Sequence, residues 1–293
     1  MIKFNKTKNM KKKKNNNNSW FYAQKSLVYS IIFIYLFITL VPLFWVISTS
    51  FKPNNEAISF PPELFPENPT IQNYIFVLTD PTLARSIFNS LIVSIGSTLL
   101  SVGVSALAGY AFARFNFRAK NVIMSIIMGL FMIPVVINII PLYIMMTNLS
   151  LLHNLISLIF TFQILIIPLN IFLLKNYFET IPKELEEAAL IDGCSRLGVL
   201  RRVTLPLALP GFAISAVLAF RFSWNEFVLP IVLANRPDSM VFQVALYQFV
   251  SLYRIEWGYL TAGINLALIP VVVLMLIFQK QMVRGLTLGA IKE

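Results

Sequence analysis

The chain has 293 residues, of which 57% are hydrophobic and 13% are charged, and its mean hydropathy is +0.73. A soluble domain carries roughly a quarter charged residues, so this composition excludes an ordinary soluble protein and indicates a chain that lies mostly in lipid. The formal net charge of +11 does not favour nucleic acid as a partner, because eight lysines precede the first apolar segment. The single cysteine, Cys194, excludes an internal disulfide, and the single histidine, His153, removes most metal and histidine-base chemistry.

The N-terminal 25 residues are rich in Lys and Asn and are expected to form a disordered basic tail in the cytoplasm. A basic region followed by an apolar run is also typical of a signal peptide. The first apolar run here, about 27–48, is too long for a signal-peptide core and has no small-residue cleavage site. It is therefore interpreted as a retained membrane helix, next to a tail that fixes topology or touches anionic lipid.

Six segments have the length and apolar character of membrane spans, since a spanning helix needs about 20 mostly apolar residues. Residues 26–293 are accordingly predicted to form one all-α, polytopic transmembrane domain. Prolines in the last four segments are expected to kink them. The first external loop, 49–86, is expected to carry an interfacial helix near residues 71–78. The predicted spans are about 27–48, 87–111, 121–146, 155–175, 207–232 and 259–279.

Lys and Arg residues indicate the orientation of these segments. With the N-terminus placed in the cytoplasm, the inside segments hold nineteen Lys and Arg residues and the outside loops hold four. Positively charged residues gather on the cytoplasmic side of membrane proteins, so both termini are predicted to be cytoplasmic. The chain is therefore expected to be a multi-pass protein of the cell membrane, with the lipid bilayer as its surroundings.

The predicted cytoplasmic loop between the fourth and fifth segments contains a clear helix pattern. Pro182 suits the first turn of a helix, where its missing N–H costs nothing, and the acidic residues that follow favour the helix dipole. Gly193 suits a left-handed C-terminal cap, and Ser195 can cap a second helix that carries Arg201 and Arg202. A helix of about three turns is predicted here, although composition alone leaves an ordinary amphipathic connector open.

The spacing within this loop resembles the EAA loop of binding-protein-dependent importer permeases. The match consists of Glu187-Ala188-Ala189, three further residues, Gly193, and a hydrophobic stretch that ends at Leu205-Pro206. A longer string, with Asp192 before the glycine, is similar to the carbohydrate branch, the maltose-type permeases. Two further segments of the chain resemble that branch, at residues 222–227 and 285–292. Cys194 departs from it, because alanine is usual at this position.

The resemblance implies that the loop forms a cytoplasmic coupling helix between helices 4 and 5, which seats in a cleft of a separate ATPase. The implied partners are a second homologous permease, a dimer of ATP-binding subunits and an external substrate-binding protein. The chain has no Gly-x-x-x-x-Gly-Lys-Ser/Thr sequence for nucleotide phosphates, so no catalytic residue, cofactor or metal is expected in it. The residues implied to contact the ATPase are Glu187, Ala188, Ala189, Asp192 and Gly193.

A second group of polar residues lies in the fifth predicted span. Arg221 is the most costly residue of the sequence, because a charge near the middle of a membrane helix costs at least about 2.5–3.5 kcal/mol on insertion scales. Trp224 and Asn225 follow three and four residues later on the same face, and Glu226 lies about 140° around the helix. These four residues are a hypothesis for the substrate pathway. The alternative, held equally, is that Arg221 and Glu226 only hold helices together.

The sequence therefore predicts a permease subunit that forms half of a translocation pathway for a sugar or related solute. One alternative is a secondary transporter driven by an ion gradient, a class that usually shows internal repeats and a midplane carboxylate. Another is a membrane enzyme, which would need clustered His, Asp or Glu at a membrane face. The lack of an internal repeat and the single histidine argue against both.

Overall fold

A computed structural model describes residues 3–250 and 255–290 of the chain, with side chains described from 24 to 250 and from 255 to 282. This part of the chain consists of helices and connecting loops, with an isolated antiparallel bridge between Val250 and Ile255, so the all-α prediction is confirmed. The helices are α1 (Lys3–Ser50), α2 (Asn54–Ala57), α3 (Gln72–Thr79), α4 (Pro81–Arg114), α5 (Lys120–Phe131), the 3-10 helix η1 (Val135–Asn138), α6 (Ile139–Asn148), α7 (Leu155–Thr161), α8 (Gln163–Thr180), α9 (Lys183–Ile191), α10 (Arg196–Val199), the π-helix η2 (Leu200–Thr204), α11 (Leu205–Leu207), α12 (Leu209–Asn225), α13 (Val228–Leu233), α14 (Phe242–Tyr247) and α15 (Trp257–Ala290).

The predicted spans correspond to straight helices and bent pairs of helices. Three helices of the described chain are long and apolar enough to cross a membrane alone, within α1, α4 and α15. The other predicted spans coincide with pairs bent by 91° between α5 and the η1–α6 segment, by 42° between α7 and α8, and by 76° before α12. The chain therefore makes up to six crossings if each bent pair crosses once.

The N-terminal segment differs from its prediction. Helix α1 begins at Lys3, so the structure gives helix in place of the disorder expected for residues 1–25, of which residues 1–2 lie outside the description. No Gly or Pro interrupts the sequence from Lys3 to Lys25, and lysine is a good helix former. The segment also extends a long apolar helix, so it needs no costly nucleus of its own.

The fifth predicted span, 207–232, is wrong as a continuous helix. Helix α12 ends at Asn225, Glu226 has extended backbone angles, and α13 starts at Val228. The Glu226 carboxylate accepts hydrogen bonds from the backbone N–H groups of Val228 and Leu229, at 3.0 and 3.2 Å. Pro230 then falls in the first turn of α13, where no N–H is required. An acidic residue followed by this proline is a helix-start signal.

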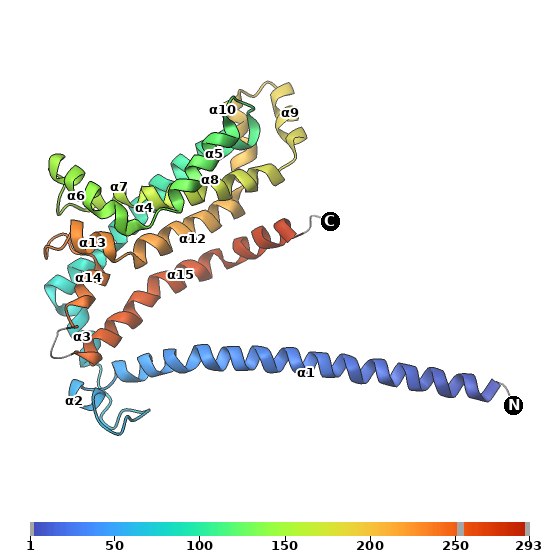
Figure 1. The fold of residues 1–293 in the computed structure, drawn as a ribbon, viewed down its shortest axis with the longest axis horizontal. Helices are drawn as coiled ribbons and strands as arrows, with labels where there is room; N and C mark the ends of the chain where they lie inside the picture. Colours follow the sequence, from blue (N-terminus) through green and yellow to red (C-terminus); the bar gives the residue numbers. More distant parts are fainter. Residues whose placement is uncertain (1–2, 251–254, 291–293) are drawn as a thin grey trace.

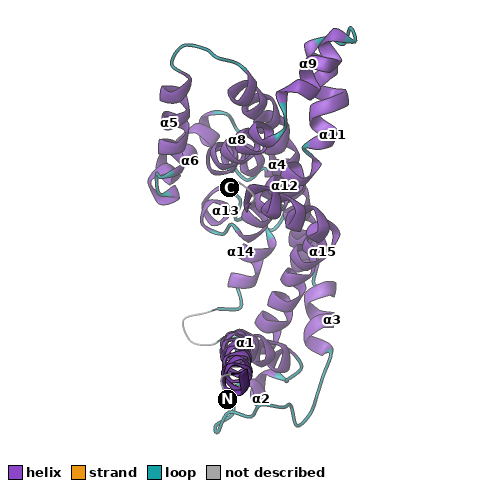
Figure 2. Ribbon diagram, turned by 90° about the vertical axis from the view of Figure 1, so that its right-hand side faces the viewer, coloured by secondary structure: helices purple, strands orange, loops and turns teal. Residues whose placement is uncertain are grey.

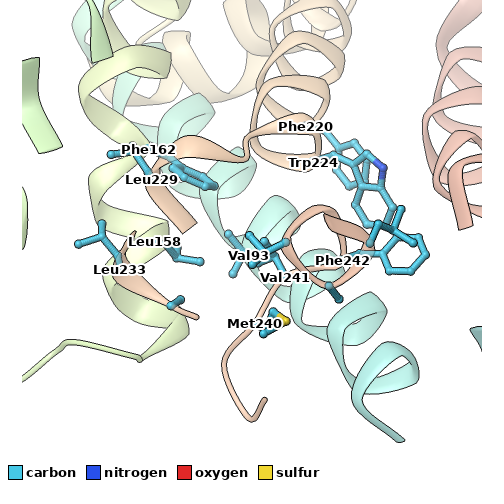
Figure 3. Packing of buried hydrophobic residues seen from close by; sticks show 14 of the residues in the cluster. Val93, Leu158, Phe162, Phe220, Trp224, Leu229, Leu233, Met240, Val241 and Phe242 are labelled. Carbon is cyan, nitrogen blue, oxygen red and sulfur yellow. The ribbon is translucent and has the colours of Figure 1, made fainter. Parts of the chain in front are cut away.

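Helix α4 is the centre of the bundle and packs against both α8 and α12. A row of buried small residues on α4 allows this close packing, as is common between membrane helices. A Cβ at Gly109 would lie only 3.0 Å from the backbone N of Lys175, so α4 and α8 meet backbone to backbone. Side chains from α4, α7, α12 and α13 converge in the main apolar cluster (Figure 3). The buried serines of the α4 row are Ser86, Ser90, Ser94, Ser97, Ser101 and Ser105.

The helices define two ends of the molecule. Helices α9 and α10 lie at one end, whereas α2, α3, α6, α13 and α14 lie at the other (Figure 1). The start of α1 and the end of α15 point toward the same side as α9 (Figure 1). Helix α1 leads away from the bundle of α4, α8 and α12 (Figures 1 and 2), and its most apolar window is 0% buried.

Candidate functional site

The predicted loop helix is present as α9, which we call the coupling segment together with Asp192 and Gly193. Pro182 precedes the helix with extended backbone angles. Gly193 has a φ of +86°, a left-handed conformation that favours glycine. The N–H of Gly193 donates to the carbonyl of Leu190, and that of Cys194 to the carbonyl of Ala189, both at 3.0 Å. These two bonds form a Schellman cap, so the predicted cap is confirmed.

A second short helix follows the cap directly. The Ser195 hydroxyl accepts a hydrogen bond from the N–H of Gly198 at 3.2 Å, as predicted for the start of this helix. Helix α10 leads through η2 and α11 into α12. The coupling segment is therefore connected to α12 through a short, regular part of the chain.

The outer face of the coupling segment is open to solvent. Glu187, Ala188, Asp192 and Gly193 are exposed, and Ala189 is half-buried. Large apolar side chains are exposed beside them, with Ile191 at 87% in particular. Apolar side chains exposed together with small residues are typical of a surface that another protein covers.

The inner face is held by Glu186, one of the acidic residues that follow Pro182, whose sequence position indicates only a favourable interaction with the helix dipole. Its side chain is 9% exposed and forms an ion pair with Arg114 of α4, with 2.9 Å between Oε1 and Nε. The Thr204 hydroxyl donates to the same carboxylate at 2.8 Å, and the Tyr110 hydroxyl donates to it at 3.2 Å. The Arg114 guanidinium also donates to the carbonyl of Ile181 at 2.9 Å. One buried carboxylate thus joins α9, α4 and η2.

The predicted pathway residues do not all share one surface. A cavity of about 300 Å³ is lined by Arg221, Asn225 and Glu226, together with Asn170 of α8 and apolar residues of α5, α8 and α12. Arg221 and Asn225 are exposed, and no Asp or Glu oxygen of the described residues lies within 4.0 Å of the Arg221 guanidinium. Glu226 is half-buried, and one of its carboxylate oxygens accepts the backbone hydrogen bonds at the start of α13.

Trp224 lies elsewhere, contrary to its placement with Asn225. Its side chain is 1% exposed, its indole N–H donates to the carbonyl of Ala267 in α15 at 2.9 Å, and its ring stacks on Phe220. Trp224 therefore packs between α12 and α15. Helical spacing places residues 221 and 224 about 60° apart on one side of α12, and the packing of α15 covers only residue 224.

The site residues offer binding and positioning chemistry. Among the residues that the structure describes, no group of three or more His, Cys, Asp or Glu could hold a metal ion. The cavity instead presents the Arg221 guanidinium, the Asn225 amide and the Glu226 carboxylate, which can donate to and accept from a polar solute, and the buried Asn170 amide lies in its wall. The coupling segment presents an exposed surface of small and apolar side chains.

Comparison with known proteins distinguishes an importer permease from a secondary transporter and from a membrane enzyme. Residues 101–288 match the family described as binding-protein-dependent transport system inner membrane component. The chain belongs to this family. It is a multi-pass membrane subunit of an ATP-driven importer and not an enzyme, and ATP is hydrolysed by a separate subunit. Nothing found supports the ion-gradient alternative.

Relatives of this permease cover nearly its whole length. It is 35% identical over 272 residues to the sulfoquinovosyl glycerol transport system permease of Agrobacterium fabrum, covering 93% of this chain and 95% of the relative. It is 35% identical over 259 residues to the trehalose/maltose transport system permease of Thermococcus litoralis, covering 87% and 92%. A crystal structure of a bacterial ABC transporter for alginate import shares its fold, with a TM-score of 0.75, 24% identity, and 88% and 96% of the two chains covered.

Proposed function

We propose that this permease forms half of a transmembrane pathway and is driven by an ATPase subunit that docks on Glu187, Ala188, Ala189, Asp192 and Gly193. The observation that carries the proposal is the asymmetry of the coupling segment. Its inner face is fixed to the bundle through Glu186, whereas its outer face is exposed and presents small and apolar side chains. Small side chains let a partner backbone approach closely, and the Glu187 carboxylate can bind a partner arginine in a bidentate pair.

The solute is proposed to pass along the α12 face that carries Arg221 and Asn225. Both side chains are exposed into the cavity, beside the amide of Asn170. Amide and guanidinium groups form hydrogen bonds with hydroxyl groups, which suits a sugar or related solute. The names of several relatives support this class, since they refer to sulfoquinovosyl glycerol, diacetylchitobiose and trehalose/maltose.

The proposed complex contains this chain, a second homologous permease, a dimer of ATP-binding subunits and an external binding protein. One permease supplies only one wall of a pathway, which is why a membrane partner is needed. An alginate transporter of the same fold was crystallised with a periplasmic protein bound to alginate pentasaccharide, which supports the external partner. The α9 end is placed in the cytoplasm with both termini, as the Lys and Arg distribution predicts.

Replacing Asn225 by alanine is expected to lower the maximal rate of solute uptake. The loss should be roughly two- to tenfold, equivalent to one hydrogen bond of about 0.5–1.5 kcal/mol. Uptake of radiolabelled glycosides by cells expressing the complete transporter measures it, with equal membrane levels verified by immunoblotting. Asn148→Ala, in an exposed amide at the end of α6 and outside the cavity, is the matched control. Unchanged rate and affinity in Asn225→Ala would remove this residue from the pathway.

A further inference from the structure

The Glu186 cluster, which consists of Tyr110, Arg114, Glu186 and Thr204, contains a buried ion pair that lies outside the cavity lined by Arg221 and Asn225. Arg114 and Glu186 are 7% and 9% exposed in their side chains, and Thr204 is fully buried. The carboxylate accepts from a guanidinium and from two hydroxyls on two different elements. A buried ion pair of this kind contributes little net stability but fixes geometry, because leaving one charge unpaired is costly.

The cluster lies directly behind the surface proposed to meet the ATPase. Glu186 and Glu187 are adjacent in sequence, but the first is buried and the second exposed. A force applied to the outer face of α9 therefore acts on an element whose inner face is bonded to other helices. These bonds are the side-chain hydrogen bonds that join α9 to α4 and to η2 in the described chain, and α9 also packs against η2.

Two of the bonded elements lead toward the cavity. Thr204 ends η2, and the chain continues through α11 into α12, which carries Arg221 and Asn225. Arg114 ends α4, which packs closely along α8, where Asn170 lines the same cavity. Packed helices shift as units between discrete arrangements, so a displacement of α9 is passed to both helices.

We propose that Glu186 is a positioning residue that transmits movement of the docked coupling segment to α4 and α12, and so to the solute pathway. This inference rests on the proposed docking of the ATPase at α9. It assigns different tasks to two neighbouring carboxylates: Glu187 binds the partner, and Glu186 passes the movement on. Glu186→Gln should therefore separate docking from transmission.

The test measures both steps in the same purified complex of permease and ATPase. Asn225→Cys, combined with Cys194→Ser, places the sole thiol of the chain in the cavity, and its rate of reaction with a charged maleimide reports the pathway state. With Glu186 intact, ATP and orthovanadate should change this rate by roughly five- to tenfold, within the range typical of coupled sites. In the Glu186→Gln version the change should fall below about twofold, while the amount of bound ATPase stays within about twofold of the parent.

Two further variants separate transmission from folding. Arg114→Gln with Glu186→Gln removes the uncompensated buried charge, so its membrane level should recover while the maleimide response stays lost. Lys175→Gln with Glu179→Gln removes the exposed ion pair of α8 and should keep the full response. A full response in Glu186→Gln or in the Arg114/Glu186 double variant would overturn the inference. Loss of the ATPase from the Glu186→Gln complex would also overturn the inference. Failure of the proposed docking gives a different result, because the Glu187→Lys complex would then retain the ATPase.

Discussion

Glu187→Lys is expected to remove most of the ATPase subunit that copurifies with the permease. Glu187 is exposed on the outer face of α9, so its reversal leaves the inner Glu186 cluster unchanged. Loss of one partner of a hydrogen-bonded interfacial charge pair costs at least about 2 kcal/mol, and a reversed charge adds repulsion. The affinity should fall by roughly thirtyfold or more. Quantitative mass spectrometry of the complex, purified through a tag on the permease, measures the ratio of the two subunits.

The matched control for this variant is Glu179→Lys. It reverses a charge at the end of α8, on a side chain that is 40% exposed and forms an ion pair with Lys175. This change lies outside the coupling segment and should leave the subunit ratio within about twofold of the parent, since surface ion pairs contribute little. An equal loss of ATPase in both variants would mean that net charge at this end, and not a specific contact of Glu187, governs the association.

Gly193→Val is expected to reduce solute uptake strongly while leaving the protein in the membrane. A side chain in the left-handed region costs roughly 1–2 kcal/mol per residue, which disfavours the observed orientation of α9 and α10 by roughly five- to thirtyfold. The cause is the backbone conformation alone, because a Cβ at Gly193 would meet no atom within 4 Å. Uptake measured at equal immunoblotted membrane level tests this expectation.

Asparagine provides the control for Gly193, because it tolerates the left-handed conformation better than other side chains. Gly193→Asn, like Gly193→Val, adds a side chain of several heavy atoms, but it should keep most of the uptake. If Gly193→Val and Gly193→Asn lose uptake equally, the size of the side chain at a protein contact is responsible and the backbone argument is wrong. If both transport normally, the turn after α9 is an ordinary connector.

Local features of the fold could be predicted from the sequence because they depend on neighbouring residues. The cap at Gly193, the helix start at Ser195 and the helix near residues 71–78, observed as α3, follow from backbone chemistry over a few positions. The long apolar helices follow from length and composition in the same way. The break at Glu226 is also a local signal, and the mostly apolar composition of the segment concealed it.

Features that depend on which helices are neighbours could not be predicted. Arg114 and Glu186 are separated by 72 residues in the sequence. Sequence alone explains Arg114 as one of the basic residues that set the topology, and Glu186 as an acidic residue that favours the helix dipole. The direction of Trp224 is of the same kind, since its partner is the Ala267 carbonyl of another helix. Helical periodicity gives the angle between side chains on one helix, but it does not identify the helix that each side faces.

Covalent cross-linking at Ala188 tests the central claim, that the outer face of α9 is the docking surface for the ATPase. Ala188→Cys in a Cys194→Ser background gives the permease a single thiol, at an exposed position of the coupling segment. Asn148→Cys in the same Cys194→Ser background gives a single exposed thiol on α6, a helix at the opposite end of the bundle (Figure 1). A short thiol-reactive cross-linker applied to membranes with the complete transporter should join position 188 to the ATPase subunit and leave position 148 without this product. Absence of the ATPase product at position 188, or equal products at the two positions, would contradict the account.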